Sequence, residues 1–425
     1  MDSVAPPLRI AVVGAGIAGI TAAYLLGKRH DVTLIERNNS IGGHTNTIAV
    51  EDRPGTILPI DTGFIVCNPV TYPLFYRLLG EWGVALRDSD MSFGYFCEQA
   101  RFGYVGPSVL GLLRGYRNTF SPAFFRLILG RHRFNRRASA DLDRGLLDDV
   151  RLDAYLERVG VDPHFVTHYL LPLGAAVWSS PDADMLRFPA RAFMQFLRNH
   201  GMLAVWRRPQ WQTVVGGSQA YVRAFRSKFR GTILENAPAQ SITRHADSVH
   251  VHLHRRDPMV FDRVVMAAHA DESLAMLSDA TSAERELLSA WSYHRNFAQL
   301  HTDASVMPRN RGLWASWNYR RAPGRPEGGP VSVTYHMNRL QGLKSDRDYF
   351  VSLNAASEVD PASVIYAVDY SHPAYTSGAL AAQHELRRLN GSNRTHFCGS
   401  YMGYGFHEDA VASAVAVAAK LGVSL

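Results

Sequence analysis

The stretch of sequence that decides the fold is Leu8-Arg9-Ile10-Ala11-Val12-Val13-Gly14-Ala15-Gly16-Ile17-Ala18-Gly19. Its apolar first half predicts a buried strand, and its glycines form the pattern GxGxxG at the start of a predicted helix over residues 17–28. In this pattern Gly14 permits a tight turn, Gly16 lets a pyrophosphate approach the backbone, and Gly19 lets the helix pack closely on the strand. The N-terminus of the helix then offers unpaired N–H groups to the phosphates.

A second predicted strand over residues 31–36 ends at Glu36, and the pair Gly42-Gly43 follows after five further residues. A carboxylate at this position accepts hydrogen bonds from the ribose hydroxyls of an adenosine and repels a 2′-phosphate, which disfavours NADP. The glycine pair lets a second loop run close beside the cofactor. The sequence therefore predicts a βαβ unit that binds a dinucleotide.

These motifs resemble the glutathione-reductase-type FAD fold, in the branch that contains flavin amine oxidases, protoporphyrinogen oxidases and phytoene desaturases. Three later segments extend the resemblance: Asp61-Thr62-Gly63-Phe64, Ala239-Gln240-Ser241-Ile242 and Gly405-Phe406-His407-Glu408-Asp409-Ala410. In that family the first lies near the isoalloxazine ring, the second binds adenine through its backbone, and the third begins a helix whose N–H groups face flavin O2 and N1. The resemblance implies an α/β fold, in which a glutathione-reductase-type FAD-binding Rossmann domain carries an inserted α+β substrate domain.

Carried over position by position, the resemblance implies that FAD is held by Gly14, Gly16, Ile17, Ala18, Gly19, Glu36, Arg37, Gly42, Gly43, His44, Thr45, Gly63, Phe64, Ala239, Gly399, Ser400, Phe406, His407 and Ala410. Two positions depart from the family. Ser400 stands where the family has an acid, so a hydroxyl must replace that contact with FAD, and Asp409 stands where the family has a glycine. No cysteine lies between Met402 and Phe406, so covalent attachment of the flavin is not expected.

A narrower resemblance spans most of the chain. It rests on Leu171-Pro172-Leu173-Gly174-Ala175-Ala176-Val177-Trp178-Ser179-Ser180, Asn199-His200-Gly201-Met202-Leu203, Val215-Gly216-Gly217-Ser218 and Tyr335-His336-Met337-Asn338-Arg339-Leu340-Gln341. These segments are similar to the NAD/FAD-binding oxidoreductases that accompany cyclopropane-fatty-acid-synthase-type methyltransferases, which include the flavoprotein desaturase of bacterial furan fatty acid synthesis. The resemblance implies an FAD-dependent desaturase or oxidase of modified, methylated acyl chains in membrane phospholipids, with a lipid methyltransferase as a candidate partner.

The order of the predicted elements indicates two domains that interrupt one another. The FAD-binding domain is expected to combine residues 1–69, 211–290 and 371–425, and residues 70–210 and 291–370 are expected to form a substrate domain that faces the membrane. A hairpin is predicted over residues 92–105, and an alanine-rich helix over residues 409–421.

The positive charge of the chain is concentrated in one segment. The net charge is +7, yet eight arginines and no acidic residue lie between Gln99 and Ala140, so the remainder is close to neutral. Leucine and phenylalanine accompany these arginines, a mixture typical of a segment in a membrane interface. We expect the Arg-rich 101–137 segment to bind a phospholipid bilayer that carries anionic lipid. The alternative is the solvated face of an ordinary pair of core helices. No nucleic-acid recognition motif accompanies the segment, so nucleic acid is not an expected partner.

Composition limits the class of protein and its compartment. With 46% hydrophobic and 20% charged residues the chain is not disordered. Cys67, Cys97 and Cys398 lie far apart, which argues against a disulfide framework and indicates a reducing compartment. No run reaches the roughly 18 apolar residues of a membrane span. We therefore expect a cytoplasmic protein that is peripherally associated with the inner face of the membrane.

Dehydrogenation of a pair of C–H groups needs a hydride acceptor, here flavin N5, and a base for the second proton, in an apolar cavity. The residues expected to line the substrate side of the flavin are Trp178, Tyr335, Tyr401 and Phe406, and the candidates for proton transfer are His336 and Tyr404. The competing interpretation is that each ring is a core residue and that His336 is a structural histidine. The amine-oxidase lysine has no evident counterpart among the four lysines, which argues against an amine substrate.

Three histidines alternate with apolar residues in Val249-His250-Val251-His252-Leu253-His254. This spacing places three imidazoles on one face of a strand, where they could bind a metal. No carboxylate or cysteine is placed to complete the set, so an exposed strand face is expected and no metal site is assigned. Two rivals to the desaturase hypothesis remain, a soluble flavin amine oxidase and a non-catalytic FAD-containing partner of a lipid methyltransferase.

Overall fold

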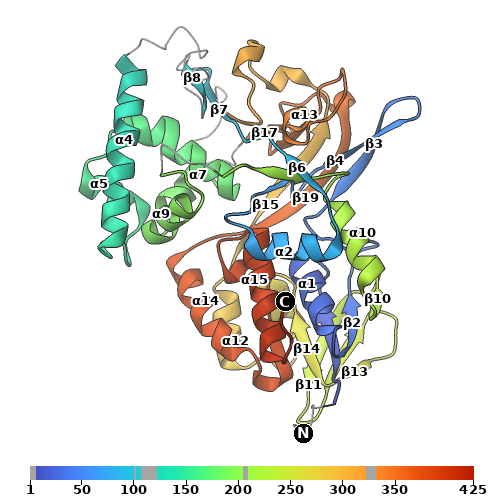
Figure 1. Cartoon of the computed structure of the whole chain (residues 1–425). Helices are drawn as coiled ribbons and strands as arrows, with labels where there is room; N and C mark the ends of the chain where they lie inside the picture. The colour runs from blue at the N-terminus through green and yellow to red at the C-terminus, as the bar shows by residue number, and fades with distance from the viewer. Residues whose placement is uncertain (1–5, 100–101, 107–121, 204–208, 322–331) are drawn as a thin grey trace.

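The computed structural model describes residues 6–99, 102–106, 122–203, 209–321 and 332–425. Figure 1 shows its two parts: a sheet with covering helices that carries both chain ends, and a second part built from a larger sheet and a lobe of helices. One buried cluster packs α1, α2, α10 and α15 against one face of the first sheet. A second cluster extends from the opposite face of that sheet into the larger sheet and the helical lobe.

The first sheet is parallel and takes its strands from distant parts of the chain. Its order is β10 (Thr232–Leu234), β2 (Asp31–Ile35), β1 (Arg9–Val13), β14 (Arg263–Met266) and β20 (Thr395–Phe397). The central strand is an apolar run because both faces of such a sheet are covered. On one face α1 (Ile17–Leu26) packs against α15 (His407–Lys420), and α1 is buried on nearly every side.

Smaller sheets extend this part. The three-stranded antiparallel sheet consists of β11 (Ala239–Arg244), β12 (Val249–Leu253) and β13 (Met259–Phe261), and a hairpin is formed by β3 (Thr47–Arg53) and β4 (Thr56–Asp61). The helices α11 (Ala270–Met276), α12 (Ser282–Ser289) and α14 (Ser377–Leu389) pack on one another, α11 lies against β11, and α14 lies beside β20.

The larger sheet has seven strands and is mixed. Its order is β19 (Val364–Pro373), β15 (Tyr293–His301), β18 (Phe350–Leu353), β17 (Val333–His336), β16 (Trp317–Arg321), β7 (Phe93–Cys97) and β8 (Phe102–Gly106), with the short α13 (Met337–Leu340) after β17. The antiparallel pair β7 and β8 confirms the predicted hairpin.

The helical lobe lies beside this sheet (Figure 1). It comprises α4 (Pro122–Asp143), α5 (Leu152–Val159), α6 (Pro163–Phe165), α7 (Leu171–Trp178), α8 (Asp182–Arg187) and α9 (Ala190–Asn199). A π-helical turn over Val166–Leu170 joins α6 to α7, directly before Pro172. Proline has no N–H to donate to the preceding turn, which explains why the regular helical pattern changes there.

Two details differ from the predicted domain limits. The helix α2 (Pro73–Trp82) was expected in the substrate domain, but its buried residues Phe75, Leu78 and Trp82 pack with α10 (Gln219–Lys228) and α15 in the first cluster. In addition, β5 (Val66–Cys67), β9 (Gln212–Val214) and β6 (Leu86–Asp88) form one small sheet across the expected boundary. The physical reason is that α2 has one apolar face, and α15 offers the nearest surface that buries it.

The Arg-rich 101–137 segment is described only in part. Arg101, Arg114 and Arg117 lie outside the described residues, whereas Arg126, Arg131, Arg133, Arg136 and Arg137 are on α4. Within the described ranges, no helix combines the length and the apolar character that crossing a bilayer requires.

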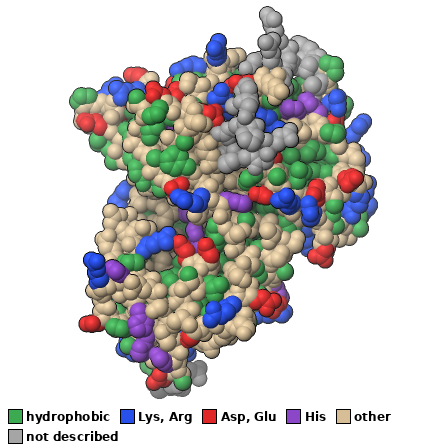
Figure 2. All heavy atoms as spheres, turned by 180° about the vertical axis from the view of Figure 1, so that it is seen from behind, with side chains coloured by type: hydrophobic (Ala, Val, Ile, Leu, Met, Phe, Trp, Pro, Cys, Tyr) green, Lys and Arg blue, Asp and Glu red, His purple; other side chains and the backbone are tan. Residues whose placement is uncertain are grey.

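Histidine side chains gather at the lower end of the molecule in Figure 2, the end at which Figure 1 places β11 and β13. Val249, Val251 and Leu253 of β12 are buried, and His250 and His252 lie on the other face of that strand. The rings of His245 and His250 are 4.5 Å apart. The alternation is therefore that of a strand with one face in the core. In the described part of the chain, no three His, Cys, Asp or Glu side chains are placed so that they could hold a metal ion together.

Candidate functional site

The first glycine loop joins β1 to α1 and is held by backbone contacts. Gly14 has φ +99° and donates from its N–H to the carbonyl of Ile35 at 2.9 Å. A Cβ on Gly14 would lie 2.9 Å from the backbone of Ala267, and a Cβ on Gly19 would lie 1.8 Å from the carbonyl oxygen of Gly14. Gly16 differs, because a Cβ there would meet nothing within 4 Å. The loop is therefore closed on the protein side and open at Gly16, as a bound pyrophosphate requires.

The second glycine loop touches the first. Gly16 and Gly42 form an isolated parallel bridge, and the N–H of Gly42 donates to the carbonyl of Ala15 at 2.8 Å. Gly43 has φ +60° and is exposed at this junction, where a Cβ would lie 3.1 Å from Cα of Gly16. Two loops that are close together in this way form a cradle that side chains would fill.

Glu36 lies at the carboxyl end of β2, beside the first loop. Its carboxylate is 6% exposed and accepts hydrogen bonds from the N–H of Ala15 at 2.8 Å and of Asn38 at 3.0 Å. The segment before β11 lies alongside, because the N–H of Ala237 donates to the carbonyl of Glu36 at 2.9 Å, and this brings Ala239 near. Arg37 is directed away and forms an exposed ion pair with Glu272 at 2.7 Å. The expected role of Arg37 in holding the cofactor therefore rests on its backbone.

The turn after β4 meets the loop after Gly43. The N–H of Phe64 donates to the carbonyl of His44 at 2.8 Å, and a Cβ on Gly63 would lie 2.0 Å from that carbonyl oxygen. Thr45 hydrogen-bonds to the hydroxyl of Tyr221. Position 63 has to be glycine, because the carbonyl oxygen of His44 occupies the space that a Cβ would need.

His407 is the first residue of α15 and completes this group. Its ring stacks on Phe64 with centroids 3.6 Å apart, and its Nε2 lies 3.1 Å from the hydroxyl of Tyr221. Burial lowers the pKa of His407 to about 3, so the imidazole is neutral near neutral pH. Ala410, one turn further on, is buried against α1.

The loop before α15 is fastened to α14. The amide of Gln383 donates to the carbonyls of Tyr401 at 2.7 Å and Gly403 at 2.6 Å, and Arg387 donates to the carbonyl of Met402. The same loop begins with Gly399, whose N–H donates to Ser413 at 2.9 Å, and Ser400, whose carbonyl accepts from Gly403 and Gly405. These bonds fix the positions of Gly399 and Ser400 beside the start of α15.

Asp409 occupies the position where a glycine was expected from the family pattern. Its carboxylate accepts from the N–H of Phe406 at 2.9 Å, and it fits because Gly403 has no side chain, where a Cβ would lie 2.2 Å from the carboxylate. Burial raises the pKa of Asp409 to about 6. A carboxyl group that is ionised above this pH would reduce the positive potential of the helix N-terminus.

Three of the predicted residues, Trp178, Tyr404 and Phe406, lie close together around Phe196. Trp178 lies 4.6 Å from Phe196, Phe196 stacks on Phe406 at 4.8 Å, and the indole N–H of Trp178 donates to the carbonyl of Tyr404 at 3.3 Å. Phe196 was not predicted, and its place in α9 gave no sequence signal beyond an apolar helix face. Tyr401 packs instead against Trp291 at 5.6 Å, and Tyr335 packs against Trp317 at 4.8 Å within the larger sheet.

The register of the larger sheet contradicts the expected position of His336. Successive residues of a strand point to opposite faces, so Tyr335 and His336 cannot face the same space. Cross-strand partners share a face, and the pairing runs from Tyr335 through Val351 and Leu300 to Tyr366 on β19. His372 lies on the same face as Tyr366, because the two are six residues apart in one strand. His336 points to the other face, where it is paired with Asp348 at 3.0 Å and stacks on Phe350. His336 therefore lies on the face opposite to Tyr335, in contact with Asp348 and Phe350, and this position gives no support to its predicted role in proton transfer.

Four histidines lie close together near the turn at Gly63. The ring of His44 lies 4.9 Å from Tyr370, 5.4 Å from His372 and 6.2 Å from His269. The fourth member, His294, is the cross-strand partner of His372. Only His44 was predicted. The alternation of Tyr366, Val368, Tyr370 and His372 was a usable signal, but it required knowledge of which face was buried.

The protonation state of His372 follows from its neighbours. The N–H of Phe297 donates to Oδ1 of Asn354, the amide of Asn354 donates to Oδ1 of Asn296 at 2.8 Å, and the amide of Asn296 therefore donates to Nδ1 of His372 at 3.0 Å. An imidazole that accepts at Nδ1 is neutral and carries its proton on Nε2. Burial, and then His269 and His294, lower the pKa of His372 to about 4.

His44 is neutral for a similar reason. Burial lowers its pKa well below the ordinary value, and His372, His269 and His407 lower it further, against a hydrogen bond to the backbone of Ser371. Its Nε2 atom is buried and has no hydrogen-bond partner among the described residues. A buried polar atom without a partner costs free energy, so a ligand that hydrogen-bonds to this atom would be stabilised.

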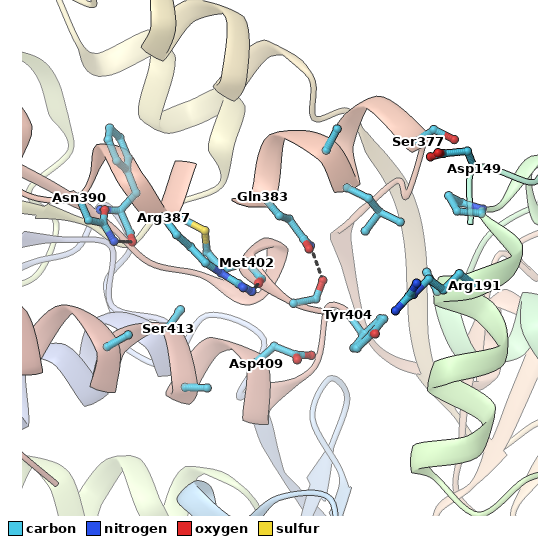
Figure 3. A pocket seen from close by; sticks show the side chains of 18 of the residues that line it. Asp149, Arg191, Ser377, Gln383, Arg387, Asn390, Met402, Tyr404, Asp409 and Ser413 are labelled. Carbon is cyan, nitrogen blue, oxygen red and sulfur yellow. Dashed lines mark hydrogen bonds between the residues drawn. The ribbon is translucent and has the colours of Figure 1, made fainter. Parts of the chain in front are cut away.

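A cavity of about 850 Å³ lies between α9, α14 and α15 (Figure 3). Its lining includes Arg191, Gln383, Tyr404 and Asp409, and Figure 3 shows Tyr404 lying between Arg191 and the start of α15. It is separate from the glycine loops, because it lies on the side of α15 that carries Asp409 and Ser413, whereas Ala410 and Ala414 face α1.

Comparison with known proteins agrees with this geometry. The family model of flavin-containing amine oxidoreductases matches residues 17–307. An L-amino-acid oxidase of Mus musculus is 26% identical over 314 residues, which cover 69% of this chain and 47% of that protein. An L-amino-acid oxidase of Pseudechis australis is 38% identical over 77 residues, which cover 18% of this chain and 13% of that protein. The chain thus spans at most about half the length of these relatives.

Solved structures share the fold along the whole chain. A fatty acid isomerase from P. acnes has a TM-score of 0.68 at 16% identity and covers 97% of this chain and 98% of its own. A putrescine oxidase has a TM-score of 0.70 at 16% identity with 98% and 99% covered, and a cyclohexylamine oxidase from Brevibacterium oxydans has 0.68 at 15% with 98% and 100% covered. The predicted fold class is confirmed. The chain belongs to the flavin-containing amine oxidoreductase family, and its cofactor is FAD.

Proposed function

We propose that the protein is an FAD-dependent oxidoreductase that dehydrogenates acyl chains of membrane phospholipids, in particular methylated or otherwise modified chains. The glycine loops and the start of α15 would hold FAD, which supplies a two-electron acceptor when bound. The other functions that the reaction requires are supplied by residues of this chain. They must exclude water, accept an apolar chain and take up a proton.

The observation that carries the proposal is the chemistry of one face of the larger sheet. The face that Tyr335 shares with His372 carries aromatic or aliphatic side chains on all seven strands, as the cross-strand pairing shows. Its polar members are Asn296, His294 and His372 at one end and Arg321, which is paired with Asp182, at the other. Its aromatic members are Phe93, Tyr95, Phe102, Tyr104, Trp317, Tyr319, Tyr335, Tyr366 and Tyr370. No strand position on this face holds Asp or Glu in the described residues. Such a face suits an acyl chain.

An amine substrate fits this face poorly. A protonated amine needs a carboxylate or several acceptors when it leaves water. The carboxylates that reach the edge of the face, Asp182 and Asp184, are already paired with Arg321 at 2.5 Å and His294 at 3.6 Å. The four lysines, Lys28, Lys228, Lys344 and Lys420, are all exposed, so none of them supplies the interior lysine of an amine oxidase.

Proton transfer is assigned to neutral side chains. Burial raises the pKa of Tyr404, so its hydroxyl stays protonated and can donate a hydrogen bond. His44 is the better acceptor, because its neutral ring has a buried Nε2 without a partner. The rings of Trp178, Phe196 and Phe406 exclude water from the start of α15. The fatty acid isomerase with the same fold supports the proposal, since an acyl substrate is compatible with this architecture.

The proposal is tested by mixing the FAD-loaded protein anaerobically with vesicles whose phospholipids carry methyl-branched or monounsaturated acyl chains. We expect the visible absorbance of the flavin to bleach and mass spectrometry of the lipid to show the loss of two hydrogens. Putrescine and L-amino acids serve as comparison substrates. Bleaching by these amines alone, with hydrogen peroxide released in air, would reject the lipid proposal.

That outcome would favour the second candidate, a soluble flavin amine oxidase. The similarity to the two L-amino-acid oxidases is the observation that supports it. If neither lipid nor amine bleaches the flavin, the third candidate, a non-catalytic partner of a lipid methyltransferase, is favoured instead.

A further inference from the structure

The outer face of α4 exposes apolar side chains that the core does not use. Among the described residues, nine large hydrophobic side chains are exposed, and three of them lie within five positions of this one helix. Phe125 is 52% exposed, Ile128 38% and Leu129 54%. The opposite side of α4, with Leu127, Phe134 and Ala138, is buried. Exposed apolar groups in a contiguous patch indicate an interaction surface.

The charges of α4 divide into paired and unpaired arginines. Arg126 makes a bidentate pair with Asp162 at 2.8 and 2.9 Å, and Arg137 pairs with Asp141 at 2.8 Å. Arg133 and Arg136 are exposed, and no acidic side chain of the described residues forms an ion pair with either. The exposed surface of the helix therefore keeps an uncompensated positive charge.

The unpaired arginines and the apolar side chains share one face. Positions 125, 129, 133 and 136 follow one another at helical spacing, with Ile128 beside them. At 1.5 Å per residue this face is about 16 Å long. Its first half is apolar and its second half is basic. Figure 1 shows α4 along the outer edge of the helical lobe.

We propose that this face of α4, formed by Phe125, Ile128, Leu129, Arg133 and Arg136, docks on the surface of a bilayer that contains anionic phospholipid. The apolar half enters the boundary between headgroups and acyl chains, and the two arginines bind lipid phosphates. Charge complementarity selects this occupant, because uncompensated guanidinium groups beside inserted apolar side chains match an anionic interface. The inference adds a membrane partner to the proposed function, but it does not depend on the acyl substrate.

The test measures binding and not turnover. The holoprotein is sedimented with vesicles of phosphatidylcholine alone and with vesicles of phosphatidylcholine and phosphatidylglycerol. We expect binding to the anionic vesicles and weaker binding at high salt. Each arginine near an anionic surface contributes roughly fivefold in affinity, so the double variant Arg133→Glu and Arg136→Glu should weaken binding by more than about twentyfold.

The apolar half is tested separately. The double variant Phe125→Ser and Leu129→Ser should weaken binding to both kinds of vesicle. Its matched control is Ile57→Ser with Val70→Ser, two residues that are 57% and 67% exposed elsewhere. The control for charge is Arg223→Glu with Arg285→Glu, which changes the net charge by the same amount at exposed positions on other helices. All variants change exposed side chains, and equal FAD content and melting temperature will verify that each one is folded.

The proposal is overturned if the holoprotein does not sediment with anionic vesicles, or if the α4 variants bind as their controls do. Reduction of the flavin by detergent-dispersed lipid, measured in parallel, separates the two proposals. Normal reduction with absent vesicle binding rejects only the docking face, and normal binding with absent reduction rejects only the proposed substrate.

Discussion

Two glycines, Gly19 in α1 and Gly174 in α7, show how differently the two parts of the molecule are built. A Cβ on Gly19 would collide with a backbone carbonyl of the adjoining loop at 1.8 Å. A Cβ on Gly174 would meet the ring edge of Phe193 at 2.7 Å and the terminal methyl of Met185 at 2.9 Å. Backbone cannot move without disturbing a strand, whereas side chains can change rotamer. The dinucleotide part is therefore specified by main-chain contacts and the helical lobe by side-chain packing.

The largest effect is expected for Gly19→Ala. The added methyl must separate α1 from the loop that holds the pyrophosphate, so we expect loss of bound FAD and destabilisation by about 3 kcal/mol or more. Flavin absorbance per chain and the melting temperature measure both effects. The matched control is Gly80→Ala in α2, where a Cβ meets nothing within 4 Å, and it should stabilise the protein by up to about 1 kcal/mol. Retention of FAD by Gly19→Ala would show that the loop is not rigid.

A smaller effect is expected for Glu36→Gln. The neutral amide keeps the shape of the side chain but weakens the charge-assisted bonds to the N–H groups of Ala15 and Asn38. It would also weaken the bond to the ribose that the predicted role of Glu36 requires. A loss of about 1.5–3 kcal/mol predicts FAD affinity that is roughly 10- to 100-fold weaker, measurable by fluorescence titration. The control is Glu235→Gln, at the end of the neighbouring strand, where the carboxylate pairs with Arg226. Equal affinities in the two variants would contradict the assigned role of Glu36.

The histidine cluster predicts acid sensitivity. The folded His372 has its pKa lowered to about 4, against an ordinary value of 6.5. Between these values the unfolded chain binds a proton that the folded chain does not, so stability is greatest above pH 6.5 and falls as the pH falls towards 4. The full contribution is about 3 kcal/mol. The free energy of unfolding, measured with urea, should depend less on pH for His372→Gln than for the wild-type protein. The exposed His384→Gln on α14 serves as the control, and a slope for His372→Gln that matches this control would refute the neutral assignment.

The smallest effect is expected for Gly174→Ala. The helix gains about 0.5–1 kcal/mol from the loss of glycine, and the adjustment of Phe193 and Met185 costs about 2 kcal/mol. We expect net destabilisation near 1 kcal/mol, a fall of roughly 2–4 °C in melting temperature, with FAD retained. A loss as large as that of Gly19→Ala would show that the helical lobe is as rigid as the dinucleotide loops.

The same contrast explains what could be predicted from the sequence. The glycine loops, Glu36 and the start of α15 are local motifs, because each residue serves a contact within a few positions of itself or at a fixed place in a βαβ unit. The fold class followed from them. The binding roles of these residues stay predictions, although the structure places most of them around one cradle.

The orientation of the side chains on the larger sheet could not be predicted in this way. The segment Val333-Thr334-Tyr335-His336 gives no indication of which of its residues share a face with the histidine cluster, and a shift of one position exchanges the two faces. The choice is made by pairing with strands far along the chain, which places His372 and His336 on opposite faces of the sheet. In the same way α2 was grouped with its sequence neighbours, although its apolar face packs on α15.

The packing of α1 against α15, with β20 beside β14, has a consequence for biosynthesis. When α1 leaves the ribosome its principal helical neighbour has not been translated, and the edge of the parallel sheet next to β14 stays open until β20 is made. Closure of such a long loop is slow. Assembly of the FAD pocket is therefore expected after translation, and a nascent chain arrested before β20 should expose apolar surface to chaperones.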